Sequence, residues 1–152
     1  MKPLAPFMDL VQATWMIRDL GQPVSAIKFC DDYSVVAGGW DGRLSYWDSD
    51  GKLLWSVDCE DRIESILNVD ENFIVTSGLH IVCVKDGDII WQHALEGSAD
   101  MLAFHEGKII ATSSVYDIEH GDFMESAIWQ FTIDGDLENV ERLDERPWFI
   151  TS

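Results

Sequence analysis

The stretch Asp50-Gly51-Lys52-Leu53-Leu54-Trp55 returns 36 residues later as Asp86-Gly87-Asp88-Ile89-Ile90-Trp91. It returns again, more weakly, as Asp134-Gly135-Asp136-Leu137-Glu138. Each Asp-Gly pair lies between runs rich in Val, Ile, Leu and aromatic residues. Glycine accepts the positive φ that tight hairpin turns need, so this pattern is the strongest short-range signal for a β-hairpin. The sequence therefore predicts a repeated unit built on hairpins.

Period-two or continuous apolar character predicts four short strands in each unit. No window after residue 20 sustains a period of 3.6 residues, which disfavours a helical repeat. Before residue 21, Phe7, Leu10, Val11 and Thr14 have helical spacing, whereas Trp15 to Leu20 is expected to be a strand. The remaining predicted strands are Ser25 to Phe29, Ser34 to Gly38, Arg43 to Trp47, Leu53 to Val57, Ile63 to Val69, Phe73 to Ser77, His80 to Lys85, Ile89 to Ala94, Met101 to Phe104, Lys108 to Ser113, Ala127 to Ile133 and Asn139 to Leu143.

Four-stranded units of about 40 residues are typical of β-propeller blades. A β-sandwich gives no reason for the repeated Asp-Gly turns, and an up-and-down barrel gives no reason for strands in groups of four. We therefore expect one all-β domain over residues 1–152, a β-propeller-type array of four-stranded antiparallel blades. The blades are placed at about 21–59, 60–97 and 98–145, with terminal strands at 15–20 and 148–152.

The blade count predicts an incomplete ring in each chain, because closed propellers have about four to eight blades. Arg146 to Ser152 is interpreted as the start of a fourth unit that the chain does not complete. Three explanations stay open. The chain is part of a longer protein, or several chains assemble one ring, or Trp15 to Leu20 and Phe149 to Ser152 close a small irregular ring.

One hairpin resembles a known family. The stretch Ala37-Gly38-Gly39-Trp40-Asp41-Gly42-Arg43-Leu44-Ser45-Tyr46-Trp47-Asp48 is similar to the hairpin between the second and third strands of WD-repeat β-propellers. In that family an Asp in the turn is followed six positions later by Trp and then Asp, as Asp41, Trp47 and Asp48 are here. The resemblance implies that Asp41 joins a hydrogen-bonded network and that Trp47 packs between blades.

The other units depart from the WD pattern. The counterpart of Trp47 is expected to be Cys83 or Phe131, and the Gly-His dipeptide of the family is absent. Related propellers whose blades end in Asp-Gly-x-x-x-Trp, as at Trp55 and Trp91, remain an alternative. The fold is the same under either assignment.

Charge and composition narrow the function classes. The chain has 28 acidic and 10 basic residues, a net charge of −18. Such a surface repels nucleic acid and anionic lipid and steers basic proteins toward itself. The apolar runs are far shorter than the roughly 20 residues that cross a membrane. Three widely spaced cysteines, Cys30, Cys59 and Cys83, indicate reduced thiols and a cytoplasmic location.

No motif assigns a catalytic residue, a metal or a cofactor. Asp48-Ser49-Asp50-Gly51 begins like a calcium loop, but Lys52 and Cys59 occupy positions where oxygen ligands are needed. The histidines lack zinc-ligand spacing. The nucleophile elbow, the phosphate loop and the dinucleotide fingerprint are all absent.

Binding is the class that remains, because turns on stiff blades hold recognition residues. The insertion from Val115 to Ser126 combines Tyr116, Phe123 and Met124 with acidic residues, which suits a basic partner. Its alternative is a longer hairpin folded over its own blade. Trp40 and its neighbour Arg43 are further candidate partner-binding residues.

The sequence thus predicts a non-enzymatic scaffold for protein interactions, whose partner is a protein, basic or mixed in charge. Two alternatives are a structural half-ring that only assembles with itself and an enzyme propeller that binds a ligand or cofactor. The first of these, like an unfinished ring, predicts a homo-oligomer. Four tryptophans are expected between blades because they lie on strands at repeated positions: Trp47, Trp55, Trp91 and Trp129.

Overall fold

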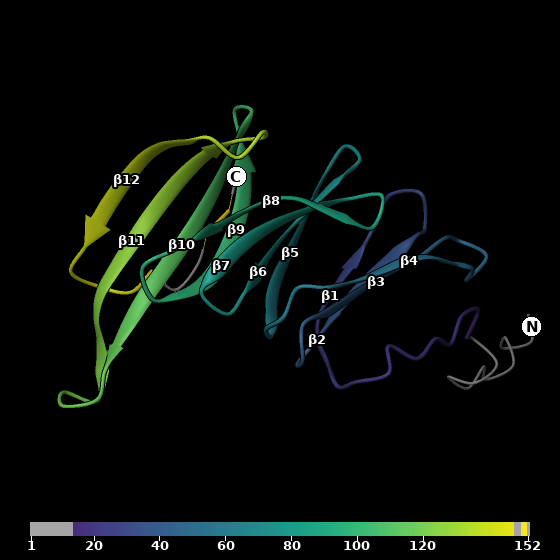
Figure 1. Ribbon diagram of the computed structural model, residues 1–152, viewed down its shortest axis with the longest axis horizontal. Helices are drawn as coiled ribbons and strands as arrows, with labels where there is room; N and C mark the ends of the chain where they lie inside the picture. The colour runs from purple at the N-terminus through teal and green to yellow at the C-terminus, as the bar shows by residue number, and fades with distance from the viewer. Residues whose placement is uncertain (1–13, 148–149, 152) are drawn as a thin grey trace, which may run out of the picture.

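The computed structural model describes residues 14–147 and 150–151, and these contain β-strands and turns but no helix (Figure 1). None of the described residues therefore forms a helix that could cross a membrane. Twelve strands lie in this part of the chain. They are β1 (Val24–Phe29), β2 (Val35–Gly39), β3 (Arg43–Trp47), β4 (Leu53–Asp58), β5 (Ile63–Val69), β6 (Asn72–Ser77), β7 (His80–Lys85), β8 (Asp88–Ala94), β9 (Ser98–His105), β10 (Lys108–Asp117), β11 (Asp122–Thr132) and β12 (Leu137–Leu143).

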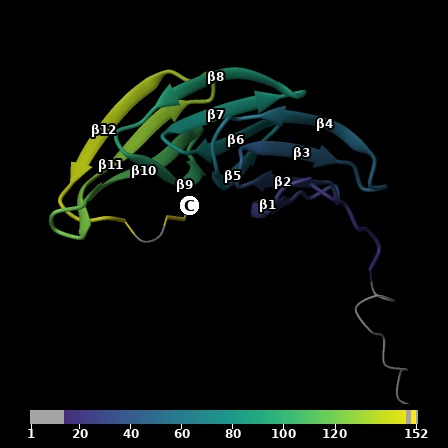
Figure 2. The ribbon, with the colours of Figure 1, turned by 60° about the horizontal axis from the view of Figure 1, so that its bottom comes forward.

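The strands form three four-stranded antiparallel sheets in chain order, here named blade 1 (β1–β4), blade 2 (β5–β8) and blade 3 (β9–β12). The blades fan out as an arch (Figure 2). Strands β1, β5 and β9 lie on its inner side, and β4, β8 and β12 lie on its outer side. The ring is not closed. The predicted all-β propeller array of four-stranded blades is confirmed.

The two ends of the chain differ from the prediction. The expected strand from Trp15 to Leu20 is wrong, because residues 14–20 pair with no sheet. Leu20 instead packs on Ala37 and Trp47, and the Arg18 Nε donates to the carbonyl oxygen of Gly51 at 2.5 Å. This segment lies on the face of blade 1 that has no neighbouring blade, so it meets a sheet face rather than a strand edge.

The predicted closing strand is only partly within the structure. Trp148, Phe149 and Ser152 lie outside the described residues. Ile150 and Thr151 are described, and they belong to no strand.

Two apolar clusters hold the blades together. Large β-branched and aromatic side chains fill both, because each central strand is buried on its two faces. Blades 1 and 2 bury Cys30, Val36, Leu44, Cys59, Ile63, Phe73, Val75, Val82 and Val84. Blades 2 and 3 bury Val69, Ile74, Ile81, Cys83, Leu95, Ala99, Ile109, Ala111, Ala127, Trp129 and Phe131.

The repeated Asp-Gly turns pack on the tryptophan of the preceding blade. Gly87 has φ +80°, and a Cβ there would lie 2.9 Å from the Cβ of Trp55. Gly135 has φ +92°, and a Cβ there would lie 2.6 Å from the Trp91 ring. The Trp91 Nε1 also donates to the carbonyl oxygen of Ile133 at 3.0 Å. Glycine is therefore needed at these turns for two reasons: it adopts the positive φ, and it lets the backbone approach the tryptophan closely.

The match between blades corrects one prediction about Trp47. Its counterpart in blade 2 is Val84 and not Cys83, because Val84 faces blade 1 whereas Cys83 faces blade 3. The connection between the paired residues Cys83 and Trp91 is one residue shorter than that between Tyr46 and Trp55, which shifts the alignment by one residue. Phe131 faces the preceding blade, as expected of a counterpart.

Three of the four tryptophans predicted to lie between blades do so, and the fourth does not. Trp55, Trp91 and Trp129 pack between blades as predicted. Trp47 is 6% exposed, but it is buried on the free face of blade 1 against Leu20 and Ala37, not between two blades.

The Gly87 contact gives a direct test of blade packing. Gly87→Ala should lower the free energy of unfolding by about 1–3 kcal/mol more than Gly107→Ala, the cost of overpacking a core. The two glycines have nearly the same φ, +80° and +77°, but a Cβ on Gly107 would meet nothing within 4 Å. Urea unfolding of both variants measures the difference. Equal losses of unfolding free energy in the two variants would show that the Gly87 turn does not pack tightly against the preceding blade.

Candidate interaction surface

Antiparallel strands in chain order place alternate turns at opposite ends of the blades. We name these the hairpin end and the Asp-Gly end. The hairpin end contains the turns at residues 40–42, 78–79 and 118–121 and the links between blades. The Asp-Gly end contains the turns at residues 30–34, 48–52, 70–71, 86–87, 106–107 and 133–136. All of the predicted partner-binding residues lie at or near the hairpin end.

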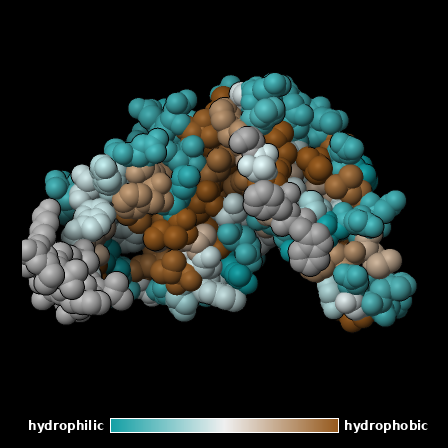
Figure 3. All heavy atoms as spheres, turned by 180° about the vertical axis from the view of Figure 1, so that it is seen from behind, coloured by the Kyte–Doolittle hydropathy of each residue, from teal (hydrophilic) through white to brown (hydrophobic). Residues whose placement is uncertain are grey.

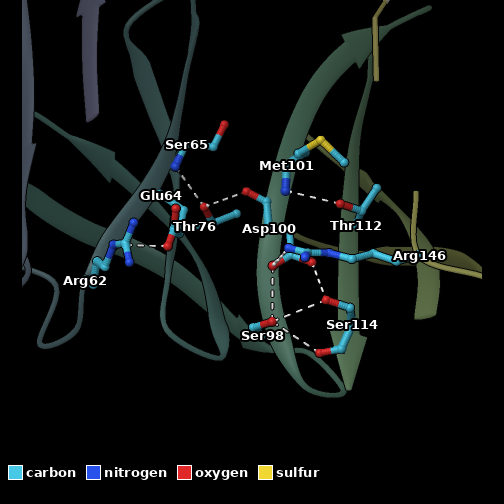
Figure 4. Close-up of polar contacts among 10 residues, drawn as sticks. All are labelled: Arg62, Glu64, Ser65, Thr76, Ser98, Asp100, Met101, Thr112, Ser114 and Arg146. Atoms are coloured by element: carbon cyan, nitrogen blue, oxygen red, sulfur yellow. Dashed lines mark hydrogen bonds and ion pairs between the residues drawn. The ribbon is translucent and has the colours of Figure 1, made fainter. Parts of the chain in front are cut away.

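Trp40 lies in the turn of blade 1 and is 50% exposed. The Arg62 guanidinium lies 3.9 Å from the centre of its ring, a cation–π contact. The Arg62 Nε in turn lies 3.0 Å from Glu64 Oε1, a contact drawn in Figure 4. Arg62 thus holds the indole in place while half of the side chain remains in solvent.

Neighbouring residues are tied to the segment before β1. The backbone N–H groups of Asp41 and Arg43 both donate to Gln22 Oε1, at 2.8 and 3.3 Å. Asp41 therefore joins a hydrogen-bonded network through its backbone. The Arg43 Nη1 donates to the carbonyl oxygen of Leu20 at 3.2 Å. Arg43 is exposed but is already engaged in holding the segment that covers Trp47.

The insertion from Val115 to Ser126 is an extension of the β10–β11 hairpin. Tyr116 pairs with Phe123 and Asp117 with Asp122, after a bulge next to Val115. Figure 1 shows its tip projecting beyond the rest of blade 3. The insertion is therefore a longer hairpin, but it does not fold over its own blade as the alternative interpretation expected.

The extended hairpin exposes some apolar side chains and covers others. Tyr116 is 53% exposed and Met124 is 45% exposed. Phe123 is only partly exposed, because the Tyr116 ring packs on it edge-on at 5.2 Å and the Arg146 guanidinium lies 4.0 Å from its centre. Phe123 is therefore better suited to supporting the hairpin than to contacting a partner.

Two exposed residues at this end were missed by sequence reasoning. Ile118 is 88% exposed at the hairpin tip, and Leu79 is 53% exposed in the turn of blade 2. A signal for Ile118 was present, because it stands in a turn between Asp117 and Glu119 and therefore has no place in a core. Leu79 follows Gly78 between two buried strands and carried no such signal.

A polar network fixes the base of the hairpin (Figure 4). The Asp100 side chain is 11% exposed and lies 3.6 Å from Arg146. The Ser98 and Ser114 hydroxyls donate to its two carboxylate oxygens, at 3.1 and 2.5 Å. The Asp100 carbonyl oxygen accepts from the Thr76 hydroxyl at 3.3 Å, which joins blade 3 to blade 2. These contacts tie the base of the hairpin on β10 to the inner strand β9 and to blade 2.

The thiols have no features of catalytic nucleophiles. All three cysteines are free and buried. Burial raises the pKa of Cys59 to about 12 and that of Cys83 to about 11, and it also raises the pKa of Cys30. They stay protonated at neutral pH and are therefore weakly reactive. Within the described residues, no three His, Cys, Asp or Glu side chains form a group that could hold a metal.

Known proteins share the fold of this chain. No protein-family model matches it, and no curated protein matches it at a significant level. The structure is similar to the designed protein Ika8, with a TM-score of 0.65, 17% identity and coverage of 78% of this chain and 36% of that one. Sqt1 of Saccharomyces cerevisiae has a TM-score of 0.65 and 16% sequence identity, and the match covers 80% of this chain and 35% of the Sqt1 chain.

A chain of the mitotic checkpoint complex gives a TM-score of 0.62 and 14% identity, covering 77% of this chain and 38% of that one. This chain thus spans little more than a third of the length of these three proteins. It matches 99% of the designed Ika4 chain, with a TM-score of 0.56 and 16% identity. The neighbours include propellers of WD-repeat type. At these identities the likeness establishes the propeller fold.

Proposed function

We propose that this chain is a non-enzymatic scaffold with WD-like blades that binds a basic or mixed protein in the cytoplasm. The observation that carries this proposal is the set of exposed apolar side chains at one end of rigid blades. Trp40, Leu79, Ile118 and Met124 come from all three blades and share the hairpin end. Buried reduced thiols are consistent with the cytoplasm.

The charge around these residues favours a basic partner. Carboxylates surround the apolar side chains at the hairpin end. The arginines there are engaged within the chain: Arg43 with the Leu20 carbonyl oxygen, Arg62 with Glu64 and Trp40, Arg142 with Glu96, and Arg146 with Asp100 and Phe123. A partner with complementary charge would associate faster and dissociate more readily at high salt. Surface carboxylates at this end include Asp41, Glu60, Asp61, Glu96, Asp117, Glu119, Asp122, Glu125, Asp144 and Glu145.

The hairpin tip provides the test. The double variant Ile118→Ser/Met124→Ser removes exposed apolar contacts and should reduce capture of salt-sensitive partners about tenfold, the loss expected from a binding hot spot. The control variant Ile90→Ser/Leu137→Ser removes two exposed apolar side chains on the outer strands, 50% and 41% exposed. Quantitative pull-down should find control capture equal to that of the parent protein. Equal capture by all three proteins would reject the hairpin as the contact.

Self-association is a second candidate function, favoured by the free face of blade 1. Ile27 and Phe29 on β1 and Leu53 on β4 are 68%, 53% and 51% exposed. Their pairing partners Ala37, Val35 and Trp47 place them on the face away from blade 2. Seen from behind, apolar side chains gather on the half of the molecule that contains blade 1 (Figure 3). A second copy would bury this face and extend the ring.

A measurement of the native mass in solution tests whether the chain self-associates. Light scattering across micromolar concentrations should give a mass above that of one chain, and Ile27→Ser/Phe29→Ser should restore the monomer, because it makes the free face polar. A monomer mass for the parent protein at every concentration contradicts the proposal.

A further inference from the structure

A cavity of about 420 Å³ opens at the Asp-Gly end, between blades 1 and 2. It lies at the opposite end of the blades from Trp40 and the extended hairpin. Strands of both blades and the turns at residues 30–34, 70–71 and 86–87 surround it. Its walls come from two separate repeats, so no single stretch of sequence encodes it.

Three aromatic rings form one wall of the cavity. The centres of Tyr46 and Trp55 are 5.3 Å apart, and Phe73 lies 5.0 Å from Tyr46 and 5.6 Å from Trp55. The planes of the three rings are tilted by 46–67° relative to one another, so the rings are not stacked in parallel. Tyr46 and Trp55 are partly exposed, whereas Phe73 is 4% exposed. Ring faces attract cations because they carry partial negative charge.

Five carboxylates line the rest of the cavity: Asp31, Asp32, Asp70, Glu71 and Asp86. The cavity lining, within the part of the chain that the structure describes, contains no lysine, arginine or histidine. Lys85 lies 3.3 Å from Glu71 outside this lining, and the side chains of the pair are 42% and 78% exposed. The cavity therefore has an aromatic wall and a net negative rim.

Asp32 is held as a charged group. The Ser34 hydroxyl and backbone N–H both donate to its Oδ1, and these bonds lower the pKa of the carboxyl. The Tyr46 hydroxyl donates to the Ser34 Oγ at 3.0 Å. The chain of hydrogen bonds thus connects the aromatic wall to the rim and fixes both.

A compact metal ion does not fit this arrangement. Metal ions need several oxygen ligands at about 2.0–2.6 Å, and the described residues hold no group of three carboxylates, histidines or cysteines close enough together. A larger organic cation suits dispersed carboxylates and ring faces better. Its charge can contact several carboxylates in turn while its methylene groups lie against the rings.

We propose that this cavity receives the cationic side chain of a lysine from a basic peptide segment. The inference rests on the proposed function insofar as the partner is a basic protein, and it adds a second contact at the opposite end of the blades. The aromatic rings hold the alkyl stem and the ammonium group, and the carboxylate rim supplies the opposite charge.

Nuclear magnetic resonance tests the inference without a known partner. The probe is a short peptide of alternating lysine and glycine residues, titrated into the full chain. The indole N–H of Trp55 and the backbone amides of Asp70 and Asp86 should shift with saturation. The same peptide acetylated at every lysine amine should leave them in place, because acetylation removes the charge.

A matched pair of charge variants separates the cavity from the general acidity of the chain. Asp70→Asn/Asp86→Asn should weaken peptide binding about tenfold, the effect of losing opposite charges near a bound cation. Both positions have positive φ, 53° and 52°, which asparagine tolerates. Asp134→Asn/Asp136→Asn removes the same charge from the Asp-Gly turn of blade 3, outside the cavity, and should leave affinity within about twofold.

Equal weakening in both variants would overturn the inference, because it would mean that the peptide binds the net charge alone. Titrations with spermine and with calcium chloride complete the test. Shifts of the Trp55 indole with either probe but not with the lysine peptide would likewise overturn it. The pull-down with hairpin variants tests the proposed function, whereas the peptide titrations test the cavity. Because the two sites lie at opposite ends of the blades, either test can fail while the other succeeds.

Discussion

The contact of an Asp-Gly turn with the tryptophan of the preceding blade sets the geometry of the whole array. At Gly87 and Gly135 the absence of a side chain lets the backbone approach Trp55 and Trp91 closely. The same glycines supply the positive φ of the turn, so hairpin formation and blade packing depend on one residue. This shared requirement explains why the dipeptide recurs, while the strands around it vary in sequence.

On the two outer faces of the array, other side chains take the place of the turn–tryptophan contact. At Gly51 no tryptophan of another blade lies near the turn within the described residues, and Arg18 occupies the space that a tryptophan fills at Gly87 and Gly135. At the other end, Asn139 pairs with Gln130 where Trp91 pairs with Cys83. Blade 3 thus presents polar side chains at the place where blades 1 and 2 present an aromatic ring. Among the described residues, the segment 14–20 lies against the apolar free face of blade 1, with Leu20 on Trp47 and Trp15 on Phe29.

The sequence predicted most strands because the alternation and the Asp-Gly turns agree locally, as at β3, β5 and β7, whose bounds are identical. It failed where tertiary context decides. Residues 15–20 have strand composition but pack on the face of blade 1 instead of pairing with an edge. The connection from Cys83 to Trp91 is one residue shorter than that from Tyr46 to Trp55, which made Cys83 look equivalent to Trp47. The extended hairpin was located but not its shape. The cavity could not be predicted, because Tyr46 and Phe73 meet only when two blades pack.

The turn–tryptophan contact is measured directly by nuclear Overhauser spectroscopy of the full chain. Cross-peaks should join the indole protons of Trp91 to the α protons of Gly135, and the side-chain protons of Trp55 to the α protons of Gly87. The α protons should also shift upfield because they lie near aromatic rings. Absence of both sets of cross-peaks, with the antiparallel pairing of each sheet intact, would show that the blades do not pack by this contact.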